Sequence, residues 1–102
     1  MKTSKLVTVE TSFIQQMKIF NIGEKLISED SEGFFPNQPF EVKNNSDKEE
    51  VVRKILKIKG VSYLCFDQHS VGIQIERFYS WNDELFDSVI KIIEEWVQKI
   101  PS

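Results

Sequence analysis

Two residues with reactive side chains lie close together in the stretch "SYLCFDQHSV", residues 62–71. Cys65 is the one cysteine of the chain and His69 is its one histidine. Thiolate and imidazole are common zinc ligands, and together they can act as nucleophile and base. Asp67, between them, adds a carboxylate. Whether these residues form half of a site or only flank a turn depends on the elements that position them.

The segments 62–66 and 71–76 are rich in β-forming residues, and four polar residues, 67–70, separate them. This pattern predicts an antiparallel hairpin. The pairs expected across it are Phe66 with Val71, Leu64 with Ile73, and Ser62 with Ile75. One face of the hairpin is then apolar, and Cys65 points to the other face. His69 is expected at the tip, too far along the strand for easy joint chelation with Cys65.

These positions favour two unremarkable roles, a half-buried thiol and a solvated imidazole. A structural zinc site needs four ligands, and only Asp67 could join Cys65 and His69. A catalytic thiolate needs a nearby base and an orienting third group, and the strand supplies neither. The chain also contains no glycine-rich phosphate loop, GxSxG elbow or HExxH motif. The sequence therefore predicts no catalytic residues, no bound metal and no cofactor.

The rest of the chain supplies further strands and two helices. Residues 5–10 and 16–22 predict strands, and residues 24–45 predict an irregular connection with a short strand at Phe40–Lys43. A capping box in residues 46–49 predicts a helix over 47–59. The stretch Ser80–Asp83 predicts the start of a second helix, which Pro101 ends. The apolar positions of this helix are Leu85, Phe86, Val89, Ile90, Ile93, Trp96, Val97 and Ile100.

The predicted order is therefore ββαββα. We expect an α+β fold in which both helices pack on one face of a small, mainly antiparallel sheet. With 102 residues, the chain has the length of a single domain, 1–102.

Composition limits the possible partners and the compartment. The formal net charge is −3, which gives no general attraction to nucleic acid or to an anionic membrane. Between Lys43 and Lys59 there are six basic residues against three acidic ones, a patch that we interpret as a solvated helix face. One cysteine cannot form an internal disulfide, and the sequence shows no signal-peptide pattern or membrane-spanning run. We therefore expect a cytoplasmic protein that binds neither nucleic acid nor membrane.

Two aromatic groups are candidates for a partner-binding surface. Phe34 and Phe35 lie in the long connection, and Tyr79 and Trp81 lie in "RFYSW", residues 77–81. Aromatic residues and arginine often anchor protein interfaces. The alternative is that Phe78 and Trp81 close the core at the helix entrance, and the pair Phe34-Phe35 poses the same choice between core and partner surface.

Three segments carry a resemblance to a known family. They are "ETSFIQQMKIF" (10–20), "ILKIKGVSYLCF" (55–66), and "VGIQI" (71–75) followed by "SW" (80–81). From about Thr8 to Val97 the chain resembles the N-terminal domain of Nfu/NifU-type iron–sulfur scaffold proteins, including proteins made of that domain alone. The family usually has a TPNPN-like turn where this chain has Thr11-Ser12-Phe13-Ile14-Gln15. If that turn contacts a partner in relatives, the contact is lost or changed here.

The resemblance implies a protein-interaction module without catalytic activity, accessory to iron–sulfur cluster assembly or delivery. In full-length scaffolds a CxxC motif in a separate domain holds the cluster, and this chain has no such motif. One alternative is a direct carrier of iron or of a cluster through Cys65, helped by His69 or Asp67, or by a symmetric dimer that shares two Cys65 thiolates. A second alternative is a small enzyme whose site the sequence does not reveal.

Overall fold

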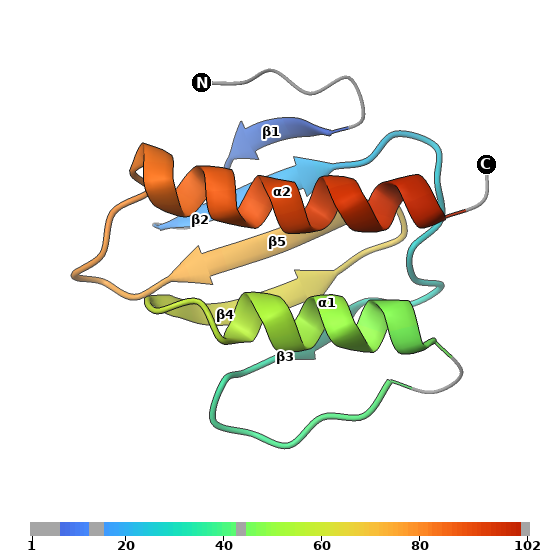
Figure 1. The fold of residues 1–102 in the computed structure, drawn as a ribbon, viewed down its shortest axis with the longest axis horizontal. Helices are drawn as coiled ribbons and strands as arrows, with labels where there is room; N and C mark the ends of the chain where they lie inside the picture. Colours follow the sequence, from blue (N-terminus) through green and yellow to red (C-terminus); the bar gives the residue numbers. More distant parts are fainter. Residues whose placement is uncertain (1–6, 13–15, 43–44, 101–102) are drawn as a thin grey trace.

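The computed structural model describes residues 7–12, 16–42 and 45–100. Five antiparallel strands form one sheet, in the order β1-β2-β5-β4-β3. Both helices lie on the same face of this sheet (Figure 1). The elements are β1 (Thr8–Thr11), β2 (Met17–Asn21), β3 (Glu32–Phe34), α1 (Ser46–Leu56), β4 (Val61–Phe66), β5 (Ser70–Ile75) and α2 (Asp83–Lys99). The predicted α+β fold with ββαββα order is confirmed, and the short strand β3 is added to it.

The short third strand was expected in the wrong place. Residues 40–42 form no strand, and Lys43 lies outside the described residues. Instead, β3 pairs with the far side of β4, where Gly33 lies opposite Cys65 and Phe34 opposite Leu64. Phe34 is buried, and so it fixes this edge of the sheet to the core. The predicted first strand begins in undescribed residues, and its described part extends one residue further, to Thr11.

The predicted hairpin is formed by β4 and β5, with one correction. Phe66 lies opposite Val71 and Leu64 opposite Ile73, as predicted. However, Val61, not Ser62, lies opposite Ile75, because the register shifts between Val61 and Tyr63. The Ser62 hydroxyl instead donates to the Gln74 carbonyl at 3.2 Å. The extra residue is a β-bulge, which local hydrophobic alternation does not reveal.

Both helices have asparagine caps. The Asn45 side chain accepts from the Lys48 backbone amide at 2.9 Å, so the N-cap of α1 is Asn45 and not Ser46. This helix ends at Leu56, earlier than predicted, and the turn after it reaches Gly60, whose φ of 101° is left-handed. Asn82 caps α2 by accepting from the Leu85 amide at 2.8 Å.

The core fills the layer between the helices and the sheet. The strands contribute four fully buried side chains to it, those of Phe20, Leu64, Phe66 and Ile73. The centroid of the Phe66 ring lies 5.3 Å from that of Trp96 on α2. None of the described helices is both long and apolar enough to cross a membrane.

Candidate functional site

The adjacent residues Phe34 and Phe35 have opposite environments. Phe34 is buried, with its ring 5.8 Å from Phe40 and 5.7 Å from Phe66. Phe35 is 45% exposed and lies against Tyr63, with 4.9 Å between the ring centroids. Phe34 therefore belongs to the core, whereas Phe35 remains available to a partner.

Tyr79 and Trp81 are half-buried and support the loop between β5 and α2. The Trp81 indole donates to the Gln16 carbonyl at 3.0 Å, and its ring lies 6.1 Å from Phe20. The Gln16 amide donates to the carbonyls of Tyr79 and Glu76, the latter at 3.1 Å. These contacts join Gln16, just before β2, to the loop between β5 and α2. The two aromatic residues thus have clear structural roles.

The alternative that Phe78 closes the core is wrong, because Phe78 is the most exposed aromatic side chain of the described residues. Phe78 lies between Arg77 and Tyr79 and is 94% exposed. Residue type did not separate it from its aromatic neighbours, because their burial depends on Gln16, about sixty positions earlier in the chain. The surroundings of Tyr63 also depend on a residue distant in the sequence, because its ring lies over Gly33. A β-carbon at Gly33 would be 2.6 Å from the Tyr63 hydroxyl oxygen.

Neither described helix covers the second face of the sheet (Figure 1). Across its centre, Ile19, Gly72, Cys65 and Gly33 lie side by side on neighbouring strands. A β-carbon at Gly72 would be 2.5 Å from the Met17 methyl carbon and 2.6 Å from the Cys65 sulfur, so both side chains lie over this glycine. We call this surface the open face and define it by Met17, Ile19, Phe35, Tyr63 and Cys65.

Cys65 and His69 do not come together as one site. Burial is the main cause that raises the pKa of the Cys65 thiol, and Asp67 raises it further, while a hydrogen bond with the Gly72 backbone lowers it. His69 is exposed at the tip, where its Nδ1–H donates to the Lys25 carbonyl at 2.8 Å. In the described part of the chain, no three His, Cys, Asp or Glu side chains converge as a metal site would require. A thiol held in its neutral form is a poor nucleophile and a poor metal ligand.

Burial also raises the pKa of Tyr63, and its neighbour Cys65 adds to this effect. The two side chains hydrogen-bond to each other. Both groups are therefore neutral at physiological pH. The open face thus presents a neutral, sulfur- and aromatic-rich centre.

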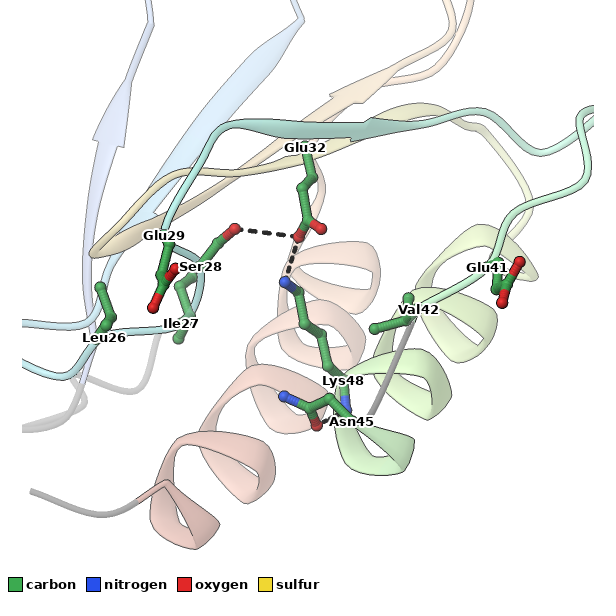
Figure 2. Close-up of a pocket in the computed structure, with 9 residues that line it drawn as sticks. All are labelled: Leu26, Ile27, Ser28, Glu29, Glu32, Glu41, Val42, Asn45 and Lys48. Carbon is green, nitrogen blue, oxygen red and sulfur yellow. Dashed lines mark hydrogen bonds and ion pairs between the residues drawn. The ribbon is translucent and has the colours of Figure 1, made fainter.

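A hollow of about 530 Å³ lies between the start of α1 and the two connections that flank β3 in the sequence. Figure 2 shows Lys48 of α1 reaching Glu32 of β3 in its centre. The Lys48 side chain is only 7% exposed, and its ammonium also lies 5.3 Å from the centroid of the Phe66 ring. The Ser28 hydroxyl donates to the same Glu32 carboxylate at 3.1 Å. Lys48 thus has a charged partner, an aromatic neighbour and no obvious catalytic task.

Together, the two layers and the open face define a small α+β domain whose uncovered sheet face carries Phe35 as an exposed aromatic side chain. No family model and no curated protein matches the chain. Among solved structures, it is similar to protein SAV1430 from Staphylococcus aureus, with a TM-score of 0.65. The match covers 85% of this chain and 96% of that chain at 11% sequence identity. At this identity, the likeness shows a shared fold alone.

Proposed function

We propose that this chain is a non-catalytic protein-interaction module, an Nfu N-terminal-like domain that binds a protein partner in cytoplasmic iron–sulfur cluster assembly or delivery. The observation that carries the interaction role is the open face. The resemblance of residues 8–97 to the Nfu N-terminal domain supports the link to cluster assembly.

The open face has the composition of an interface centre. In an antiparallel sheet covered by helices on one side, the other side normally carries polar side chains. Here Met17, Ile19 and Cys65 occupy its middle, and the rings of Phe35 and Tyr63 pack against each other beside them. The polar residues Glu10 and Gln74 lie next to this centre on the same face. Interface centres are depleted in charged residues and enriched in aromatic residues and methionine. A partner that covered Phe35 would bury apolar surface that the domain now exposes to water.

The alternative, a direct carrier of iron or of a cluster, depends on the protonation state of Cys65. It requires Cys65 to bind as a thiolate, whereas its surroundings raise the pKa of the thiol. A single thiolate also falls short of the set that usually holds an iron–sulfur cluster. These points favour the interaction module over the carrier.

Anaerobic capture of the tagged protein from its native cells tests the proposal. The proteins that copurify are identified, and the iron content of the eluate is measured. We expect iron–sulfur assembly proteins with an iron-free bait. Iron bound to the bait, and lost in Cys65→Ser, would support the carrier and contradict the proposal.

A further inference from the structure

We propose that Gly33 is a positioning residue of the open face, because its missing side chain lets the Tyr63 ring lie over β3 and hold Phe35 in place. This inference rests on the proposed function and deepens it. The partner recognises Phe35 and Tyr63 together as one aromatic surface, rather than Phe35 alone. Three observations carry the inference: the strand register, the space above Gly33 and the contact between the two rings.

Strand pairing brings Gly33 and the two rings to the same face of the sheet. Gly33 lies opposite Cys65 in the pairing of β3 with β4. Because side chains alternate along a strand, Tyr63 shares the face of Cys65, and Phe35 shares the face of Gly33. The same register, continued by one residue beyond β3, sets Phe35 opposite Tyr63. The centroids of the two rings accordingly lie 4.9 Å apart.

The Tyr63 ring occupies the space that a side chain at position 33 would need. A β-carbon at Gly33 would be 2.6 Å from the Tyr63 hydroxyl oxygen, and 3.1 Å and 3.2 Å from two carbons of the ring. The backbone does not require glycine here, since among the described glycines only Gly23 and Gly60 have left-handed φ angles. In a strand, glycine is otherwise less favourable than alanine. The ring above Gly33 therefore explains why glycine suits this position.

The Tyr63 ring has neighbours that fix its position. The Phe35 ring packs against it at a tilt of 41°, and the Tyr63 hydroxyl shares a hydrogen bond with Cys65. A β-carbon at position 33 pushes the hydroxyl end of the ring away from β3, which disturbs both contacts. Because aromatic pairs prefer particular relative orientations, displacing the Tyr63 ring also changes the orientation of Phe35. Phe35 is 45% exposed, so this change alters the surface that a partner meets.

Quantitative anaerobic capture from native cells tests the inference with the tagged full chain. The iron–sulfur assembly proteins captured at a bait concentration below saturation are measured by mass spectrometry. Gly33→Ala should reduce their amount about fivefold, the change in affinity that one aromatic pair supplies. Tyr63→Phe keeps the ring and should retain them. Gly33→Ala/Tyr63→Phe lacks the atom nearest the added methyl group and should capture within about twofold of Tyr63→Phe.

Further variants and a measurement without partner separate positioning from general destabilisation. Gly23→Ala adds the same methyl group where no atom lies within 4 Å, and it should capture as much as the unaltered chain. Tyr63→Ala removes the ring without adding an atom, and it should reduce capture as Gly33→Ala does. In the isolated protein, nuclear Overhauser contacts between the rings at positions 35 and 63 should weaken in Gly33→Ala and return in the double variant.

The outcomes distinguish this inference from the proposed function. Loss of capture in Phe35→Ser, with full capture by Gly33→Ala or by Tyr63→Ala, would overturn the inference and leave the proposed function standing. Equal losses in Gly33→Ala and Gly23→Ala, no recovery in the double variant, or unchanged ring contacts in Gly33→Ala would also overturn the inference alone. Full capture by Phe35→Ser, or no captured proteins with the unaltered chain, would overturn both.

Discussion

Cys65 illustrates how the surroundings of a side chain decide its chemistry. The one cysteine lies four positions from the one histidine, which suggests a shared site. In the fold, however, Cys65 lies on the open face of the sheet and His69 lies at the tip of the hairpin. The alternation of β4 predicts the face, and the length of the turn predicts the tip. The same hairpin register pairs Cys65 with Gly72. The Met17 side chain that this glycine admits depends on the pairing of β2 with β5, which lie far apart in the sequence.

The raised pKa of Cys65 predicts a loss of stability in alkaline solution. Burial keeps the folded thiol protonated above the ordinary value of about 8.5, so the unfolded state binds fewer protons there. The free energy of unfolding should therefore fall as the pH rises from 8 to 10. Urea unfolding at several pH values measures it. In Cys65→Ala the decline should be shallower, and an unchanged slope would contradict the assigned pKa shift.

Lys48 and Glu32 give a second prediction at the scale of single residues. Glu32→Gln leaves a nearly buried ammonium without its charged partner, which should lower the free energy of unfolding by about 2 kcal/mol. Adding Lys48→Met removes the buried charge and keeps the length of the side chain. We expect the double variant to be more stable than Glu32→Gln alone, as measured by urea unfolding. A double variant less stable than the single one would show that the ammonium is not the source of the loss.

The elements show where local sequence is informative and where it is not. Helix α2 follows its apolar spacing and its Asn82 cap, because both signals lie within the helix itself. Strand β3 was missed, since three residues with a central glycine carry little strand signal. The bulge at Ser62 was also missed, because it depends on pairing with β5. In each case the missing information lies in the neighbouring element.

Two glycines separate backbone strain from crowding. Gly60 and Gly23 both have left-handed φ angles, 101° and 78°, but only Gly60 has a neighbour within reach of a β-carbon, the Tyr79 ring at 2.7 Å. Gly23→Ala should destabilise by about 1 kcal/mol from strain alone. Gly60→Ala should cost at least about 2 kcal/mol, because the ring must also move. Thermal unfolding of both variants measures the difference, and equal losses would remove Tyr79 from the explanation.

The whole molecule has one covered and one uncovered sheet face. The sequence predicts this asymmetry, because two amphipathic helices suffice for one side of a small sheet. It does not predict which aromatic residues the fold leaves outside. Phe35 and Phe78 are exposed, whereas Phe34 is in the core and Trp81 is tied to Gln16. Residue type identified the aromatic groups as candidates, but only the tertiary contacts show which of their members are exposed and which are buried.

The most direct test of the open face compares two exposed phenylalanines in anaerobic capture from native cells. Phe35→Ser removes an open-face side chain, and Phe78→Ser makes the same substitution in the loop between β5 and α2. Circular dichroism first establishes that both variants are folded. We predict that Phe35→Ser loses the proteins captured by the unaltered chain and that Phe78→Ser retains them. Full capture by Phe35→Ser, or loss in Phe78→Ser alone, would contradict the open face as the partner-binding surface.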